Sequence, residues 1–219
     1  MKYILGNWKA NKNFLEVKQW IYTFQREYHV HENVTLGVFP PFPFISYVQG
    51  KLKDCKNVFV GAQTLSSFEK GSYTGDVTAT SLEGVASYSI IGHSERRSTF
   101  PESETDALLA EKVKQALSHS IIPVYCVRNE QDSIPHDVKF VAYEPVAAIG
   151  TGQNESPEQV VKMKKKMKLP ENCVFLYGGS VDEKNASDYF ATGEIDGFLL
   201  GKASLDPVQF IKIAQAAQS

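Results

Sequence analysis

Residues 138–152 read VKFVAYEPVAAIGTG. The apolar run ends at Glu144, and a segment of small residues from Pro145 to Gly152 follows it. This order indicates a carboxylate at the end of a buried strand, beside a loop with room to move, and functional residues concentrate on loops that a rigid scaffold positions. A single Glu at a strand end is more often a solvated or paired surface acid, so the prediction depends on what stands at the ends of the other strands.

Short apolar runs alternate with longer amphipathic segments along the chain. We expect eight strands, at 3–8, 34–39, 58–62, 88–92, 121–126, 139–143, 174–177 and 197–200. We expect helices where apolar residues recur at helical spacing, at 14–28, 103–118, 157–167, 182–191 and 206–217. Such alternation predicts parallel strands joined by helical crossovers. A closed, eight-stranded parallel (β/α)8 barrel of one domain, 1–219, fits better than an open doubly wound sheet, because no glycine fingerprint follows the first strand.

The connection between the fifth and sixth expected strands is short. A strand of five or six residues is about 17 to 20 Å long, and the chain has to travel back over that length. A helix over 127–138, at ~1.5 Å per residue, would use almost the whole segment on the return and leave nothing for loops. We therefore expect the fifth helix to be missing or reduced to a turn. This also accounts for a length of 219 residues, where about 250 are typical of such barrels.

The composition excludes several classes of protein. With 42% hydrophobic and 22% charged residues and a net charge of -2, the chain buries a core and offers no basic surface for nucleic acid. No apolar stretch approaches the ~20 residues of a membrane span, and the first apolar run is too short for a signal peptide. The three cysteines are widely spaced, which argues against a disulfide framework or a zinc site. We expect a cytoplasmic protein with no metal, no membrane partner and no nucleic-acid partner.

Polar or glycine-rich segments follow other expected strands as well. Asn7 and Lys9 stand at the end of the first strand, and His93 follows the fourth, directly before a helix start. Glycine-containing turns at 177–180 and 200–204 follow the seventh and eighth strands. Each of these segments alone is more often a turn, a helix cap or a buried polar residue. Their common position at strand ends gives them weight, because all carboxyl ends of a parallel barrel lie on one face.

Together with Glu144, these segments resemble those of the triosephosphate isomerases, in the order expected for that family and over essentially the whole chain. The resemblance implies a TIM barrel that interconverts dihydroxyacetone phosphate and D-glyceraldehyde 3-phosphate through an enediolate, without a cofactor. It implies Glu144 as the base, His93 as a neutral electrophile and proton donor, and Lys9 as an electrostatic stabiliser. Asn7 would orient Lys9 and donate to the substrate, and Glu95 would position Lys9.

Two further sites follow from the resemblance. It implies that backbone N–H groups of Gly150, Ser180, Gly201 and Lys202 bind the substrate phosphate, which helix ends and glycine turns favour. It also implies a lid over the site, which desolvation of the base requires. That lid consists of Pro145, Val146, Ala147, Ala148, Ile149, Gly150, Thr151 and Gly152.

The loop from Thr64 to Thr78 is long, and long loops in compact domains tend to be functional. In the family that the chain resembles, this loop docks beside the active site of a second copy. The resemblance therefore implies a homodimer, with Phe68 and Tyr73 on the docking loop and Thr74 reaching the partner's catalytic Asn and Lys.

The chain departs from the family pattern at four positions. Ala147 replaces a lid tryptophan, Asn129 replaces its acidic partner, and Arg128 and Lys202 each replace a glycine. From the first two we expect a lid that is latched less firmly. From Lys202 we expect backbone strain if its φ is positive.

Two other readings of the sequence stay open. In the first, the chain is another phosphate-binding barrel, such as a sugar-phosphate epimerase. In the second, it is a catalytically silent barrel that serves as a binding scaffold. An ion pair between Arg97 and Asp76 is expected to be structural.

Overall fold

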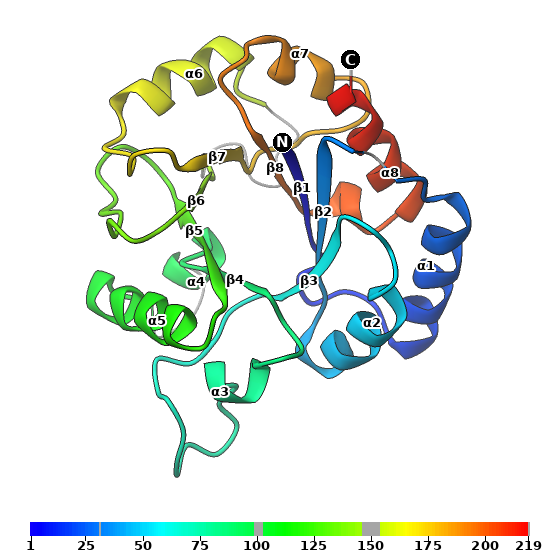
Figure 1. The fold of residues 1–219 in the computed structure, drawn as a ribbon. Coiled ribbons are helices and arrows are strands. Elements are labelled where there is room, and N and C mark those ends of the chain that lie inside the picture. The colour runs from blue at the N-terminus through cyan, green and yellow to red at the C-terminus, as the bar shows by residue number, and fades with distance from the viewer. Residues whose placement is uncertain (31, 99–102, 146–153, 219) are drawn as a thin grey trace.

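The protein is described from a computed structural model, in which residues 1–30, 32–98, 103–145 and 154–218 are described. Eight parallel strands form a closed barrel in which each strand pairs with the next and the last pairs with the first (Figure 1). The strands are β1 (Lys2–Asn7), β2 (Val34–Phe39), β3 (Val58–Ala62), β4 (Tyr88–Ile91), β5 (Ile122–Val127), β6 (Phe140–Tyr143), β7 (Val174–Tyr177) and β8 (Gly197–Leu200). The predicted fold class, an eight-stranded parallel barrel, is confirmed.

The strands carry apolar side chains on both faces, because the inner face lines the packed interior of the barrel and the outer face is covered by helices. One cluster fills the interior and includes Leu5, Val124, Phe140 and Leu176. A larger cluster lies between the barrel and the helices that surround it. Since side chains alternate along a strand, successive residues of one strand enter different clusters. In β6, Ala142 belongs to the inner cluster and Tyr143 to the outer one.

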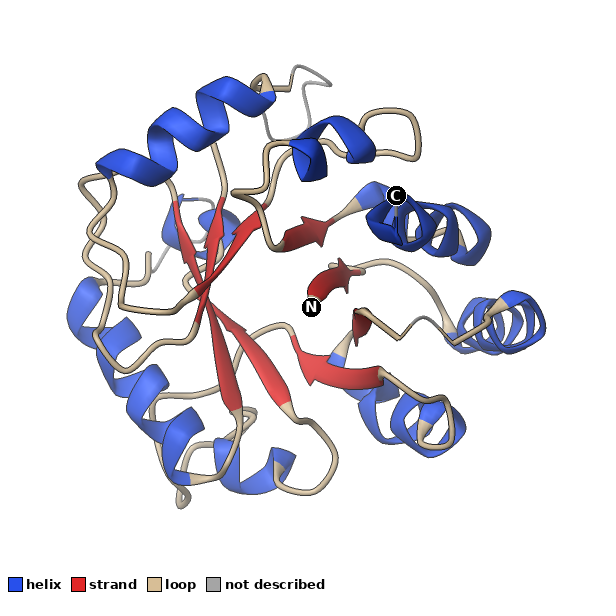
Figure 2. Ribbon diagram, turned by 45° about the horizontal axis from the view of Figure 1, so that its top comes forward, coloured by secondary structure: helices blue, strands red, loops and turns tan. Residues whose placement is uncertain are grey.

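The helices lie outside the barrel (Figure 2). They are α1 (Phe14–Glu27), α2 (Ile45–Leu52), α3 (Ala79–Leu82), α4 (Ser94–Ser98), α5 (Asp106–Ser118), α6 (Pro157–Lys166), α7 (Ala186–Ala191) and α8 (Pro207–Gln215). Short 3-10 helices occupy Phe42–Phe44, Lys202–Ser204 and Ala216–Gln218. Asn13 starts α1 and Ser156 starts α6, each through a capping box that satisfies free N–H groups at the helix end.

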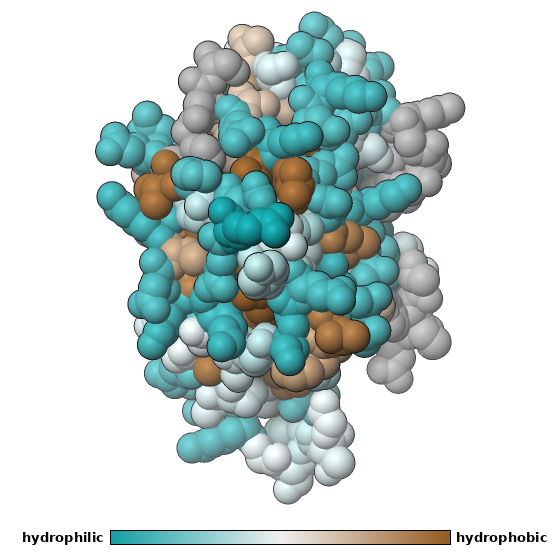
Figure 3. Space-filling model, turned by 90° about the vertical axis from the view of Figure 1, so that its right-hand side faces the viewer, coloured by the Kyte–Doolittle hydropathy of each residue, from teal (hydrophilic) through white to brown (hydrophobic). Residues whose placement is uncertain are grey.

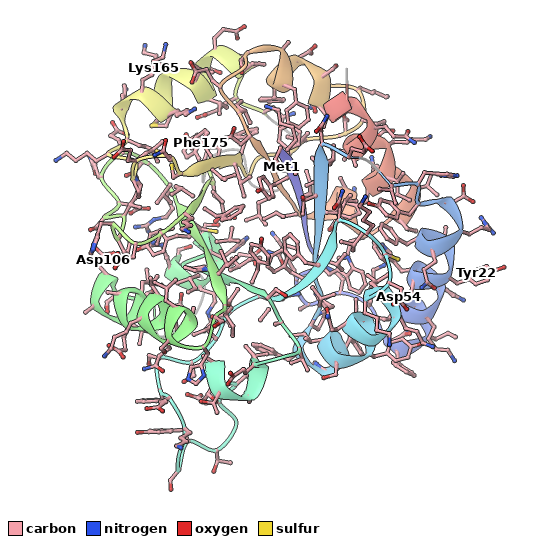
Figure 4. The ribbon with its side chains drawn as sticks, in the orientation of Figure 1. Met1, Tyr22, Asp54, Asp106, Lys165 and Phe175 are labelled. Atoms are coloured by element: carbon pink, nitrogen blue, oxygen red, sulfur yellow. The ribbon has the colours of Figure 1, made fainter. Side chains whose placement is uncertain are left out.

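The outer surface is mostly hydrophilic on the side of α1 and α8, with scattered apolar side chains (Figure 3). Tyr22 of α1 and Lys165 of α6 point away from the barrel (Figure 4). No helix in the described part of the chain has the length and apolar character needed to span a membrane.

No helix lies between β5 and β6, as we expect from the length of this connection. Residues 128–139 form bends and turns instead. The Arg128 guanidinium binds both carboxylate oxygens of Asp132, at 3.0 and 2.7 Å, and the backbone N–H of Arg128 donates to the same carboxylate at 2.7 Å. Such a two-point contact fixes the geometry of the pair, so Arg128 holds the shortened connection in place.

Candidate active site

Polar side chains from the ends of three strands meet at the carboxyl-end face of the barrel. Asn7 ends β1 with Lys9 two residues later, His93 lies two residues after β4, and Glu144 directly follows β6. These four side chains lie around a cavity of about 30 Å³, whose other lining residues are Gly178, Leu199, Leu200 and Gly201. A cavity of this size has room for about one water molecule.

Lys9 is held in an unusual backbone conformation. Its φ is 53°, in the left-handed region that costs a non-glycine residue roughly 1 to 3 kcal/mol. The Asn7 side-chain oxygen accepts the Lys9 N–H at 3.0 Å, and the Gln63 amide donates to the Lys9 carbonyl at 2.9 Å. The ammonium group of Lys9 lies 2.7 Å from a carboxylate oxygen of Glu95. These contacts thus fix both the backbone conformation of Lys9 and the position of its ammonium group.

The Glu144 carboxylate is buried and bound at both oxygens. Its Oε1 atom lies 2.9 Å from Nε2 of His93, and its Oε2 atom accepts the backbone N–H of Ser94 at 2.9 Å. The side chain of Glu144 is 3% exposed and that of His93 is 7% exposed, so the contact is almost free of solvent. An acid and an imidazole that share a hydrogen bond in a dry site can exchange a proton with a bound substrate.

Each group shifts the pKa of the other. Burial alone raises the pKa of Glu144, but His93, the Ser94 N–H and Lys9 together lower it below its usual range. Burial alone lowers the pKa of His93, but the adjacent Glu144 carboxylate outweighs it, so the pKa of His93 is raised. The helix start after His93 does not reveal this effect, because Glu144 stands at the end of a different strand.

The second ring nitrogen of His93 shows which tautomer fits. Its Nδ1 atom lies 3.2 Å from the backbone N–H of Glu95, which donates to it. An acceptor at Nδ1 requires a lone pair, and formation of imidazolium would break this bond. The neutral ring with its proton on Nε2 satisfies both the Glu95 N–H and the Glu144 carboxylate. This assignment follows from the hydrogen-bond partners.

Two glycines allow the site to be compact. A Cβ atom on Gly178 would come within 2.8 Å of Cγ of Glu144, so only glycine lets the turn after β7 pack against this carboxylate. A Cβ atom on Gly201 would lie 3.5 Å from Cε of Lys9. The turns after β7 and β8 therefore border the cavity from the side opposite His93's strand.

Comparison with known proteins identifies the family. The sequence model described as triosephosphate isomerase matches residues 2–137 and 132–217. The triosephosphate isomerase of Mesomycoplasma hyorhinis is 34% identical, over 96% of this chain and 96% of its own length. That of Aquifex aeolicus is 34% identical over 97% of this chain and 98% of its own length. The chain belongs to the triosephosphate isomerase family.

The two stretches that match the triosephosphate isomerase model overlap at 132–137, inside the connection between β5 and β6 that has no helix. Two of the departures from the family pattern lie nearby. Arg128 forms the ion pair with Asp132. The side-chain oxygen of Asn129 accepts a hydrogen bond from the backbone N–H of Gln131 at 2.9 Å. The third departure, Ala147, lies outside the described residues.

The predicted phosphate-binding and lid residues are described only in part. Pro145 is buried next to Glu144, whereas Val146 to Gly152, including Gly150, lie outside the described residues. Ser180 follows the turn after β7, and the exposed Lys202 opens a 3-10 helix after β8. Lys202 is not among the residues with positive φ, so the strain that we considered for it is absent.

Arg97 does not pair with Asp76, and this prediction is wrong. Its guanidinium donates to the carbonyls of Gly92 and Cys126, at 2.8 and 3.0 Å, and lies 3.3 Å from the carboxylate of Asp106. Asp76 instead accepts the hydroxyl of Ser66 at 2.6 Å. Arg97 thus joins Gly92, which follows β4, to Cys126 of β5.

The long loop 64–78 extends away from the barrel beside α3 (Figure 1). Near its tip the rings of Phe68 and Tyr73 stack with centroids 3.7 Å apart, and each residue is 43% exposed. Thr74 is also exposed. At the base of the loop, Lys112 donates to the Thr64 hydroxyl at 3.0 Å. The loop therefore presents a stacked aromatic pair to its surroundings.

Sequence reasoning misses two residues that shape the site, and the contact made by a third. Ser94 contributes only a backbone N–H, which no side-chain pattern reveals. Gln63 follows β3 and would be found by asking what stands at every strand end. Gly178 was predicted as part of a turn, but its contact with Glu144 depends on the packing of β7 against β6. Within the described ranges, no group of three or more His, Cys, Asp or Glu side chains is placed to hold a metal ion.

Proposed function

We propose that this member of the family interconverts dihydroxyacetone phosphate and D-glyceraldehyde 3-phosphate with Glu144 as the base. The observation that carries this assignment is the buried contact of Glu144 with His93, beside the ammonium group of Lys9. Proton abstraction next to a carbonyl needs a base, a hydrogen-bond donor for the enediolate oxygens and a positive charge. The three side chains supply these in one cavity.

Substrate has to displace the contact between Glu144 and His93. The Glu144 carboxylate occupies the hydrogen-bonding direction of the Nε2 atom of His93, where a substrate oxygen would bind. When a carbonyl oxygen takes the place of Oε1 at His93, Glu144 is released toward the carbon that bears the proton. It also loses the stabilising proton of Nε2, so its pKa rises and its basicity with it.

His93 then donates from Nε2 to the developing enediolate oxygen. Once Glu144 has left, the contact that raises the pKa of His93 is gone. The Glu95 N–H at Nδ1 then favours the neutral ring, so the donor is an imidazole and not an imidazolium. Lys9 stabilises the negative charge that develops, and such preorganised charge is usually the largest single contribution to catalysis. Asn7 fixes the Lys9 backbone, and Glu95 fixes its ammonium group.

For the phosphate we propose the backbone N–H groups of Gly150, Ser180, Gly201 and Lys202. Gly201 lies beside Lys9, which supports a dianion at this end of the cavity. We propose residues 145–152 as the lid. The scheme uses no metal and no cofactor.

A coupled assay tests the proposal. Purified protein is given D-glyceraldehyde 3-phosphate, and formation of dihydroxyacetone phosphate is followed with a reductase and NADH. We expect turnover, and a loss of about 10²- to 10⁴-fold in kcat for Glu144→Gln, which keeps the size of the side chain and one acceptor oxygen but removes the base. Wild-type protein without turnover in either direction contradicts the proposal, as does a Glu144→Gln variant with full activity.

We also propose a homodimer in which the loop 64–78 of one copy docks beside the active site of the other, with Thr74 reaching toward Asn7 and Lys9 of that copy. The exposed, stacked pair of Phe68 and Tyr73 supports it, because exposed aromatic groups of this kind mark interaction surfaces. Light scattering on Tyr73→Asp tests the dimer, with Tyr22→Asp as the control at a residue that is 67% exposed on α1. We expect the first variant to be monomeric and poorly active and the second to behave as wild type.

We place this reaction in glycolysis and gluconeogenesis, and the protein in the cytoplasm. Membership of the family supports the pathway. The free thiols of Cys55, Cys126 and Cys173 support a reducing compartment. Cell fractionation with an antibody against the protein tests the location.

A further inference from the structure

Three tyrosine hydroxyl groups converge on Glu155, which lies between the end of the expected lid and α6. The Tyr143 hydroxyl donates to the carboxylate oxygen Oε1 at 3.0 Å, and the Tyr189 hydroxyl donates to the backbone carbonyl at 2.7 Å. The backbone N–H of Glu155 donates to the Tyr177 hydroxyl at 3.2 Å. The side chain, the carbonyl and the N–H of one residue are thus each bound by a different element, namely β6, α7 and β7.

This cluster is buried. Tyr143, Tyr177 and Tyr189 are at most 2% exposed, and their rings pack in sequence with centroid distances of 6.2 and 5.0 Å. The second carboxylate oxygen of Glu155 is buried too and has no hydrogen-bond partner in the part of the chain that the structure describes. Loss of a hydrogen bond from a buried carboxylate with few partners costs free energy, because the oxygen is then left unsatisfied. The bond from Tyr143 therefore holds the Glu155 side chain firmly.

The cluster lies directly behind the proposed base. Tyr143 precedes Glu144, and because side chains alternate along a strand, its ring lies on the outer face while Glu144 points into the cavity. Tyr177 precedes Gly178, whose N–H donates to the Tyr143 carbonyl at 2.7 Å. A Cβ atom at Gly178 would come within 2.8 Å of Cγ of Glu144, so this glycine lies close to the base. The ends of β6 and β7 are therefore joined by the backbone and, on their outer face, through Glu155.

We propose that Glu155 is a positioning residue for Glu144. Its carboxylate fixes the Tyr143 ring, Tyr177 and Tyr189 fix its backbone, and the main chain of Glu144 is thereby held against Gly178. The inference rests on the proposed function, since it assigns Glu155 a role in the same reaction. Burial and the neighbouring Glu155 carboxylate both raise the pKa of Tyr143, so its hydroxyl stays a hydrogen-bond donor at neutral and mildly alkaline pH.

Kinetics of four variants test the role. Tyr143→Phe removes one hydroxyl, Glu155→Ala removes its acceptor, and the double variant removes both. Because small displacements of a catalytic group are costly, we expect each single variant to lower kcat about tenfold while KM stays within about twofold. Since both changes break one bond, the double variant should be no slower than the slower single variant. Glu155→Gln keeps an acceptor oxygen and should keep at least about half of kcat.

Glu158→Gln is the matched control, because Glu158 is an exposed acid three residues away, and its carboxylate accepts the Ser156 hydroxyl at 2.6 Å. It should leave kcat unchanged. A single variant with the kcat of the wild type, effects that multiply in the double variant, or a Glu155→Gln variant as slow as Glu155→Ala overturns the inference. If Glu155→Ala does not fold, Tyr143→Phe decides by the same criterion. Wild-type protein that converts neither triose phosphate contradicts the proposed function, whereas active wild-type protein with unaffected variants contradicts only the role of Glu155.

Discussion

The Nε2 atom of His93 lies 2.9 Å from the Oε1 atom of Glu144, so the proposed base and the proposed proton donor bind each other. Neither group reaches a substrate in this arrangement without giving up the other. The contact keeps a carboxylate ionised in a site where burial alone would favour its neutral form. In the proposed reaction, substrate takes the place of this contact.

The pair predicts a specific pH dependence of stability. The pKa of Glu144 is lowered from its ordinary 4.5, so its contribution is present above pH 4.5 and is lost as the pH falls through the folded-state pKa. The pKa of His93 is raised from its ordinary 6.5, so its contribution is complete below pH 6.5 and is lost as the pH rises through the folded-state pKa. The pair should therefore stabilise the protein most between pH 4.5 and 6.5.

Urea unfolding at fixed protein concentration, for wild type and Glu144→Gln at a series of pH values, measures this effect. The difference in the free energy of unfolding should be greatest inside the window and decrease on both sides. A difference that does not change with pH contradicts a coupled pair of charges.

Gly178→Ala should damage catalysis through Glu144. The new Cβ atom would come within 2.8 Å of Cγ of Glu144 and 3.1 Å of the Tyr143 carbonyl, so the base has to shift. We expect kcat to fall about 10- to 100-fold, because displacements of the order of 1 Å have such effects. Steady-state kinetics in the coupled assay measure this.

Gly50→Ala in α2 is the matched control, since nothing lies within 4 Å of its new Cβ atom. It should leave kcat unchanged and stabilise the protein by about 0.5 to 1 kcal/mol, because alanine loses less freedom in a helix. Equal kcat values for the two alanine variants would show that the turn after β7 does not position Glu144.

The barrel could be predicted because its signal is local. The run 58–62 is apolar and bounded by polar residues, and β3 has the same limits in the structure. Helix α2 was missed, since Gly50 and the preceding Phe42–Phe44 turn weaken its helical pattern, and it is stabilised by packing on β3 and burying Ile45 and Val48. Helix α7 begins later than predicted, because Asp182 accepts backbone N–H groups in a separate turn.

The predicted members of the site could be found because a closed parallel barrel gathers all its strand ends. That rule brings Asn7, His93 and Glu144 together without any knowledge of rotamers. It does not say that Glu144 binds His93 and the Ser94 N–H, since this depends on where the side chain turns. It also gives the wrong partner for Arg97, because nothing in the sequence order shows that Asp106, the first residue of α5, lies nearer the guanidinium than Asp76 does.

Lys202→Ala should have little effect on substrate affinity. The Lys202 side chain is exposed, whereas the proposed contact with phosphate is made by its backbone N–H, which alanine keeps. We expect KM within about threefold of wild type, with the change disappearing at high salt, because exposed charges are screened. A rise in KM of about tenfold or more that persists in salt would mean that the ammonium group binds the phosphate directly.

Gln63→Leu should weaken catalysis through Lys9. The Gln63 amide donates to the carbonyls of Lys9 and Phe39, both at 2.9 Å, and so supports a lysine backbone with φ at 53°. Without the amide, the strained backbone relaxes and the ammonium group moves, so kcat/KM should fall about tenfold. In a Lys9→Met background the same change should have almost no effect, because the group that it positions is gone. Equal losses in both backgrounds would show that Gln63 acts on stability alone, which thermal unfolding of the two variants measures separately.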